Sequence, residues 1–189
     1  MTVQSAKIGL DQLHYALLTA DTALALTYGT VTALPAAIEA KITAANTETV
    51  LYADNALSEV AYALGKVTLE LNVKDIDLET QAALLGHSIA LGVMVVNVND
   101  VAPYVAVGFR SLKANGKYRY TWLLKGKFGE IDDNSKTRGE TTEFQTATLK
   151  GVFGGTIHTG DVIRKSDEDA TGYTSAVATA WWTSPVIET

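Results

Sequence analysis

The chain has 189 residues, of which 47% are hydrophobic and 19% are charged. This balance favours one folded domain with a sizeable core and excludes wholesale disorder. The net charge of −6 argues against a protein that coats DNA, and the absence of cysteine excludes disulfides, thiolate metal sites and cysteine catalysis. The start of the chain lacks the apolar core of a signal peptide, and the longest apolar region, 82–96, is too interrupted to span a membrane. We expect a soluble protein of a reducing compartment.

The first part of the chain is predicted to be mostly β-strand. Apolar and polar residues alternate in 8–19, 36–45 and 62–74, and this period of two is typical of strands with one buried face. A short strand is expected at 50–52, and 20–35 is expected to form a loop.

Two of these segments, 36–45 and 62–74, divide clearly into an apolar and a polar face. Strict alternation places one face in the core and the other against water or a polar partner. The apolar side chains expected in the core are Ile38, Ile42, Val67, Leu69 and Leu71. The polar side chains expected on the opposite face are Glu39, Lys41, Thr43, Lys66, Thr68, Glu70 and Asn72.

A single helix is predicted next. Asp77 can cap its start, and Gly86 can end it in a left-handed conformation. Leu78, Ala82 and Leu85 fall on one side of such a helix and form an apolar stripe.

A β-hairpin is predicted over 104–126. Asn115-Gly116 is typical of a two-residue type I′ turn, because both central residues of that turn need a positive φ. The resulting register would place Phe109 opposite Trp122 on one face of the sheet and Arg110 on the other.

Basic and aromatic residues interleave along this hairpin, a pattern that also occurs on nucleic-acid-binding surfaces. The predicted register separates the arginines from the aromatic residues. It therefore favours a basic edge that docks onto an acidic surface of a neighbouring copy.

The last third of the chain combines charged loops with further strands. A polar loop is expected at 130–143, which is longer than most connections in compact domains. Strands are expected at 144–153, near 157–163 and at 173–182. Between the last two, the acidic run 167–169 is expected to form an exposed loop.

No sequence motif indicates catalysis, a cofactor or a metal. The signatures of serine hydrolases, zinc proteases and phosphate-binding loops are absent. The three histidines are far apart in the sequence. Asp167, Asp169 and Gly172 imitate part of a calcium loop, but Ala178 stands where the bidentate Glu would be required. We therefore predict that the protein is not an enzyme.

The sequence resembles the major tail proteins of long-tailed phages of Gram-positive bacteria, which are the subunits of the tail tube. The segments that carry the resemblance are IGLDQLHYALLT (8–19), AAIEAKI (36–42), LYADN (51–55), LETQAALLGH (78–87), VAPYVAVGFRSLKANGKYRYTWLLKGKF (101–128) and FQTATLKGVF (144–153). Their specificity lies in their order, spacing and combination.

The resemblance implies a mostly β, sandwich- or barrel-like tail tube domain over 1–189, with one flanking α-helix, long loops and terminal arms at about 1–7 and 185–189. It implies hexameric rings that stack into a tube in the virion, assembled in the host bacterial cytoplasm. Expected partners are further copies of the chain, a tape-measure protein, tail terminator and distal tail or baseplate proteins, and DNA in transient passage. No cofactor or membrane segment is implied.

Within such a tube, the polar face described above would line the lumen. The loop at 130–143 would bridge subunits through its charged residues Asp132, Asp133, Lys136, Arg138 and Glu140. The terminal arms would become ordered only in the assembly. Two alternatives remain open at this point: a monomeric, virion-associated module of the lectin or adhesin kind, and an enzyme of unrecognised class.

Overall fold

The computed structural model describes residues 5–34, 37–53, 56–132, 137 and 145–186. The fold is mostly β, as predicted. In chain order, its elements are β1 (Lys7–Asp21), β2 (Leu26–Tyr28), β3 (Thr32–Ala33), β4 (Ala37–Ala53), β5 (Ala56–Val73), α1 (Leu78–Leu85), β6 (Ser88–Ala90), β7 (Val93–Val95), β8 (Val105–Lys113), β9 (Tyr118–Phe128), β10 (Ala147–Phe153), β11 (Ile163–Asp167) and α2 (Ser175–Ala180).

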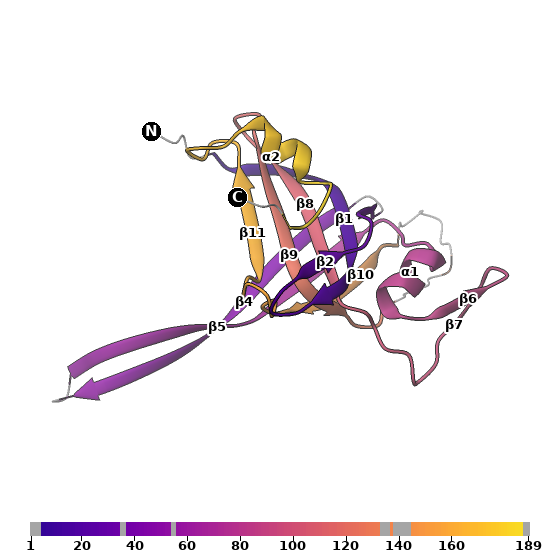
Figure 1. The fold of residues 1–189 in the computed structure, drawn as a ribbon, viewed down its shortest axis with the longest axis horizontal. Coiled ribbons are helices and arrows are strands. Elements are labelled where there is room, and N and C mark those ends of the chain that lie inside the picture. The colour runs from indigo at the N-terminus through magenta and orange to yellow at the C-terminus, as the bar shows by residue number, and fades with distance from the viewer. Residues whose placement is uncertain (1–4, 35–36, 54–55, 133–136, 138–144, 187–189) are drawn as a thin grey trace.

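One large antiparallel sheet forms the body of the molecule (Figure 1). Its main strand order is β2-β1-β8-β9-β10-β5-β4, with β3 added to β1 and β11 added to β9. Strand β9 is the centre of this arrangement, because it pairs with β8 on one side and with both β11 and β10 on the other. Strands β6 and β7 form a separate small sheet.

The sheet curls around its main core. Buried side chains of β1, β5, β8, β9 and β10 meet there, including Leu13, Leu69, Val107 and Leu123, and Leu84 of α1 joins them. The opposite face of β8 and β9 carries a second core around Trp122, which the segment containing α2 covers. Both faces of β8 and β9 are therefore buried, which explains their nearly continuous burial.

Helix α1 confirms the predicted capping. The carboxylate of Asp77 accepts hydrogen bonds from the backbone N–H and the side-chain hydroxyl of Thr80, at 3.0 and 2.9 Å. Gly86 ends the helix with a φ of 79°. A Cβ at this position would lie 2.4 Å from the carbonyl oxygen of Val101, so the close approach also requires glycine.

The hairpin over β8 and β9 exists, but its predicted turn and register are wrong. Residues 114–116 form a three-residue turn in which only Gly116 has a positive φ, 79°, so Asn115 does not adopt the type I′ conformation. The extra turn residue shifts the register by one, and Trp122 lies opposite Gly108 instead of Phe109. Trp122 and Phe109 consequently belong to different cores.

The same shift changes the relation between the basic and aromatic residues. Arg110 lies opposite Tyr120, and its guanidinium carbon sits 3.8 Å from the ring centre of Tyr118. Arg110 thus shares a face with the aromatic residues, contrary to the expectation of separate faces.

Three further differences concern local structure. Residues 173–182 were expected to form a strand, but 175–180 form α2, which packs over the second core instead of joining the sheet. The loop expected at 20–35 contains β2 and β3. The strand expected near 157–163 begins only at Ile163, after a turn.

Ile38 is 56% exposed, although it was expected in the core. A bulge between Ala37 and Glu39 changes the alternation at the start of β4, so that Ala37 packs against the core in place of Ile38. Ile42 packs against the core as expected, together with Ala40. The other expected core residues, Val67, Leu69 and Leu71, are fully buried.

Two hairpins project from the body in opposite directions (Figure 1). The far ends of β4 and β5 form a long hairpin on one side, and β6 and β7 form a short one on the other. The functional side chains considered below lie on these two projections and on the body between them.

Candidate functional site

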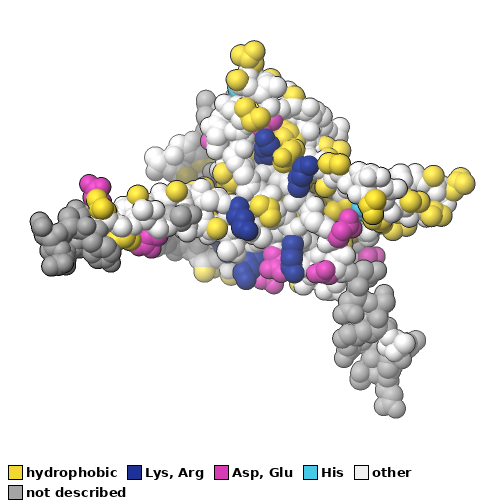
Figure 2. Space-filling view, turned by 90° about the horizontal axis from the view of Figure 1, so that it is seen from below, with side chains coloured by type: hydrophobic (Ala, Val, Ile, Leu, Met, Phe, Trp, Pro, Cys, Tyr) yellow, Lys and Arg dark blue, Asp and Glu magenta, His cyan; other side chains and the backbone are white. Residues whose placement is uncertain are grey.

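The β6–β7 projection presents aliphatic side chains to solvent. Residues 88–99 contain no charged side chain. Leu91 and Val98 are fully exposed, at 104% and 100%, and Val93, Val95 and Val96 are also exposed. On the face shown in Figure 2, hydrophobic groups gather along this projection, while Lys and Arg side chains lie on the body. Exposed aliphatic groups at this density are typical of a protein interaction surface.

The outer part of the β4–β5 hairpin carries a second apolar strip. Val60, Tyr62 and Leu64 alternate with alanines along β5, so they share one face, and all three are exposed. Across the hairpin, Val50 lies opposite Val60. This face is on a part of the hairpin that extends beyond the sheet, where it is available to another molecule (Figure 1).

The body, in contrast, pairs its charges internally. Lys113, a buried lysine, bonds to Asp169 and, at 2.9 Å, to Asp167. Arg119 donates from Nε to Asp167 at 2.8 Å, and Lys117 lies 3.1 Å from Asp169. Hydrogen bonds from Lys113 foremost, then from Asn115 and Lys117, hold the pKa of the Asp169 carboxyl well below its usual range.

The acidic run 167–169 therefore binds to the β8–β9 hairpin of its own chain and does not form the exposed loop that was expected. Glu168 takes part as well, because its carboxylate accepts from the Tyr118 N–H and the Tyr120 hydroxyl, each at 3.0 Å. The basic edge expected to dock onto a neighbouring copy is thus largely neutralised within the chain.

Asp21 provides a second internal pairing on the body. Its carboxylate accepts from Lys125 at 2.7 Å and from the backbone N–H groups of Ile157 and His158. Burial acts to raise the pKa of Asp21, but these hydrogen bonds outweigh it and lower the pKa.

His87 forms a clasp at the base of the β6–β7 projection. Its Nδ1 lies 2.8 Å from Asp100 Oδ2 and its Nε2 lies 3.4 Å from Glu130 Oε1, and the imidazole is buried. Asp100 also accepts from the Asn97 N–H at 2.9 Å. The hydrogen bond to Asp100, followed by the contacts with Glu130, raises the pKa of His87 despite the opposing effect of burial. The clasp joins the two ends of the projection to each other and to the body.

The seven lumen candidates lie on the strands as the alternation predicts. Cross-strand pairs join Glu39 to Asn72, Lys41 to Glu70 and Thr43 to Thr68, and Lys66 follows on the same side of β5. This face is opposite to the one that carries the buried Leu69 and Leu71. Four of these residues, together with Thr148, line a polar hollow of about 190 Å³. Whether they face a lumen depends on an assembly and stays a prediction.

Of the loop candidates, Asp132 is described. It forms an isolated backbone bridge with Thr148, and its carboxylate lies 3.6 Å from Lys150 Nζ on an exposed part of the surface. Asp133, Lys136, Arg138 and Glu140 lie outside the described residues. The start of the loop is thereby attached to β10.

Part of the N-terminal arm is bound to its own chain. Ser5 Oγ accepts from the Asn115 N–H at 3.0 Å, the Ala6 carbonyl accepts from the Ala114 N–H at 2.8 Å, and Lys7 begins β1. The β8–β9 hairpin thus offers residues 5–7 partners within their own chain. Residues 1–4 lie outside the described residues, and the ordering of the arm in an assembly stays a prediction. At the other end, Pro185 is buried, and 187–189 lie outside the described residues.

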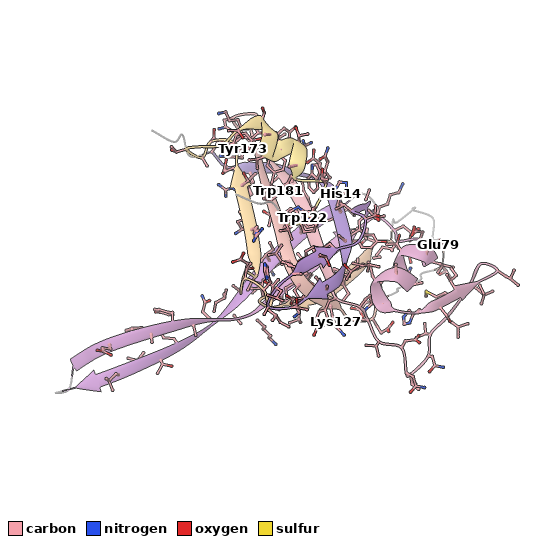
Figure 3. The ribbon with its side chains drawn as sticks, in the orientation of Figure 1. His14, Glu79, Trp122, Lys127, Tyr173 and Trp181 are labelled. Atoms are coloured by element: carbon pink, nitrogen blue, oxygen red, sulfur yellow. The ribbon has the colours of Figure 1, made fainter. Side chains whose placement is uncertain are left out.

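The histidines and tryptophans occupy structural positions. His14 stacks on Trp182 with ring centres 4.4 Å apart, and Trp181 is buried and accepts through its carbonyl from the Trp122 indole N–H (Figure 3).

The described part of the chain holds no group of three or more His, Asp or Glu side chains placed to bind a metal ion. Among the helices in these same ranges, none has the length and apolar character needed to cross a membrane.

No protein-family model matches the chain, and the search of curated proteins gave no match either.

The sequence reasoning missed the two projecting apolar surfaces. The signal for the first was present, since 88–99 is rich in aliphatic residues and free of charge without the periodicity of a core element. The second has no distinct signal, because the alternation of 62–74 is the same in the part of β5 that covers the core and in the part that continues beyond the sheet toward residue 56.

Proposed function

We propose that the protein is a structural subunit of a phage tail tube, which assembles with copies of itself into stacked hexameric rings. The observation that carries the proposal is the pair of projecting hairpins. Each presents exposed apolar side chains, and they extend from opposite sides of a body in which Lys113, Arg119 and Lys125 are paired with aspartates of the same chain (Figures 1 and 2).

The geometry supports repetition of a single contact. Two different surfaces on opposite sides of one chain favour a head-to-tail contact, and such contacts produce closed rings or open filaments. A symmetric dimer would need the same surface on both partners. Between a closed ring and an open filament, the sequence resemblance to tail tube subunits favours the ring.

The charge distribution supports a conduit for DNA. A tube wall that offered many free Lys and Arg side chains would bind the phosphate backbone and retain the genome. On the proposed lumen face, Lys41 lies opposite Glu70. Glu39 adds a further negative charge to this face, and Lys66 adds a positive one. On β8 and β9, Lys113, Arg119 and Lys125 are each bonded to aspartates of the same chain, and the net charge is −6.

The direct test is an image of the purified protein by negative-stain electron microscopy over a range of concentrations, with and without the tail terminator and distal tail proteins as initiators. Rings with sixfold symmetry, or hollow tubes, are expected. A strict monomer under all of these conditions would contradict the proposal.

A second test addresses the lumen face. The chain has no cysteine, so Thr43→Cys introduces a unique thiol on the exposed polar face of β4. In dispersed subunits, this thiol should react with a small maleimide and with a maleimide on a long polymer. In tubes, only the small reagent should react at an appreciable rate. Equal labelling of tubes by both reagents would place Thr43 on the outside.

A further inference from the structure

We propose that Leu91, at the tip of the β6–β7 hairpin, docks into an apolar pocket beside β1 on a second copy of this chain. This inference rests on the proposed self-assembly and adds the two surfaces that would meet. It is carried by the conformation of the tip, the composition of the pocket and the positions of both on the molecule.

The hairpin tip has an unusual conformation for its sequence. Ala90 pairs with Val93, so Leu91 and Gly92 form a two-residue turn, and their φ values of 53° and 75° are those of a type I′ turn. Asn, Asp or Gly normally occupies the first of these positions, because a bulky side chain is strained at positive φ. Leu91 nevertheless stands there with a fully exposed side chain, so packing against the described residues does not offset the strain.

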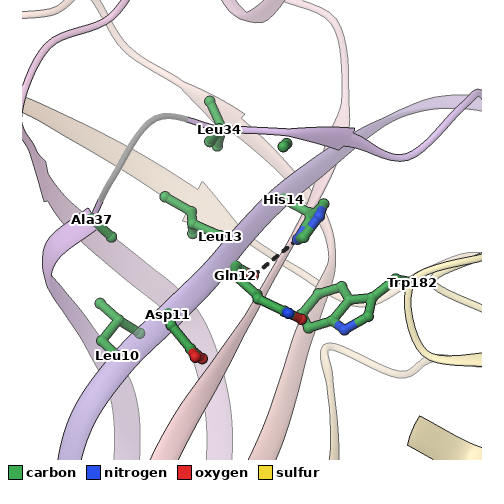
Figure 4. A pocket seen from close by; sticks show the side chains of 9 residues that line it. Leu10, Asp11, Gln12, Leu13, His14, Leu34, Ala37 and Trp182 are labelled. Atoms are coloured by element: carbon green, nitrogen blue, oxygen red, sulfur yellow. Dashed lines mark hydrogen bonds between the residues drawn. The ribbon is translucent and has the colours of Figure 1, made fainter. Parts of the chain in front are cut away.

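The pocket has a volume of about 530 Å³ and lies where β1, β3 and the start of β4 meet the segment after α2 (Figure 4). Leu10, Leu13, Leu34 and Ala37 supply aliphatic walls, and Trp182 closes one side. Figure 4 shows these side chains around a common space. This volume can accept an aliphatic side chain together with part of the turn that carries it.

The pocket wall contains the second strained residue. Among the described residues other than glycine, positive φ occurs at two positions, Leu91 and Gln12. Gln12 lies in an irregular part of β1, between Asp11 and His14, where the pairing with β8 shifts register. Strained backbone is retained mainly where function requires it. One such residue at the tip and one in the pocket mark both as candidate contact surfaces.

Charge and position make a second copy the occupant. The hairpin carries no charge from 88 to 99, and the pocket's one acidic side chain, Asp11, is paired with Arg110 through contacts of 2.6 and 2.9 Å. In Figure 1, the β6–β7 tip lies at the far end of its projection, well away from β1 and α2. This separation excludes docking of the tip into the pocket of its own chain, so the proposed contact joins two copies and can repeat around a ring.

The test uses single-cysteine variants, because the natural chain has no thiol that would interfere. Leu91→Cys places a thiol at the tip, and Ala33→Cys places one in the pocket wall. The two purified full-length variants are mixed and oxidised, and disulfide-linked dimers are measured on a non-reducing gel. The matched control replaces Leu91→Cys by Leu24→Cys, since Leu24 is also an exposed leucine, at 92%, in a different turn.

The expected result is a mixed dimer of Leu91→Cys with Ala33→Cys that forms at least tenfold faster than the dimer with the Leu24→Cys control. Equal rates for the two mixtures would overturn the inference. That outcome would also result if a different partner, or another segment of this chain, filled the pocket.

A complementation experiment gives an independent answer. Leu91→Asp disables the tip, and Ala33→Trp fills the pocket, so neither variant alone should assemble. Their mixture retains one intact tip and one intact pocket and should form a one-to-one dimer in analytical ultracentrifugation. Absence of that dimer, with both variants folded by circular dichroism, would also overturn the docking.

The failure of the docking and the failure of the proposed function remain distinguishable. If Leu91→Asp forms normal rings or tubes, the docking inference is wrong, but the proposal that the protein is a tube subunit stands. A specific cross-link without any rings or tubes from the natural chain would support the docking and contradict the tube.

Discussion

The body and the projecting hairpins differ in where their side chains find partners. On the body, Lys113 and Lys125 each have an aspartate of the same chain within hydrogen-bond distance, and Trp122 is fully enclosed. On the projections, aliphatic side chains such as Leu91 and Leu64 remain exposed. This difference leads us to propose that folding depends on the body and association on the hairpins, so substitutions in the two regions should affect different measurements.

The largest effect on stability is expected from Trp122→Ala. Trp122 is 0% exposed, packs over Gly108 and donates its indole N–H to the Trp181 carbonyl at 3.0 Å. Its loss should lower the free energy of unfolding by about 3–5 kcal/mol, as measured by urea titration. A decrease below about 1 kcal/mol would show that the second core is not essential to the body.

A smaller but clear loss of stability is expected from Lys113→Met. The substitution removes the buried cation that Asp167 and Asp169 share, and leaves the two carboxylates with the more exposed Arg119 and Lys117. Loss of the buried partner from a group of close, partly buried charges is unfavourable. The matched control is Lys117→Met, because Lys117 contacts the same Asp169 from an exposed position. The control should change the unfolding free energy by at most about 1 kcal/mol. Equal urea midpoints for both variants would contradict the internal role of the pairing.

The His87 clasp should make stability depend on pH. The pKa of His87 is raised in the folded state, so its contribution is fully present below the unfolded value of about 6.5 and is lost as the pH rises through the folded pKa. Urea midpoints measured from pH 6 to 9 should therefore decline more in the natural chain than in His87→Gln. Parallel profiles would indicate that His87 does not change its protonation between the two states.

The smallest effect on stability is expected on the β4–β5 projection. Tyr62→Lys replaces an exposed aromatic side chain that extends beyond the sheet, so the free energy of unfolding should stay within about 0.5 kcal/mol. Association, followed by sedimentation velocity, should nevertheless weaken. A variant that is both stable and fully competent for assembly would remove this strip from the proposed interface.

The features that could be predicted from the sequence are those set by neighbouring residues. The alternation along β5 predicts which of its faces is buried, and Asp77 and Gly86 predict where α1 begins and ends. The polar face of β4 and β5 was located correctly as a face, because alternation fixes which side chains share a side.

The remaining features depend on distant partners. A three-residue turn and a two-residue turn are both compatible with Asn115-Gly116, and the choice moves Trp122 from one core to the other. Residues 173–182 have strand-like composition, but the open face above Trp122 accommodates them as a helix. Asp167 and Asp169 of the acidic run bond to Lys113, which is more than 50 residues away in the sequence. A local sequence pattern cannot predict a pairing over such a separation.

The central position of β9 has a consequence for how the chain reaches its native state. Its partners β8, β10 and β11 come from both directions along the chain, and β1 must pair with β8 about 90 residues away. Trp122 stays uncovered until α2 and Trp181 have been synthesised. Folding should therefore be slow for a chain of this size, in the range of milliseconds to seconds, and should finish only after translation has passed residue 181. The β4–β5 hairpin, whose strands are adjacent in sequence, can form long before that point.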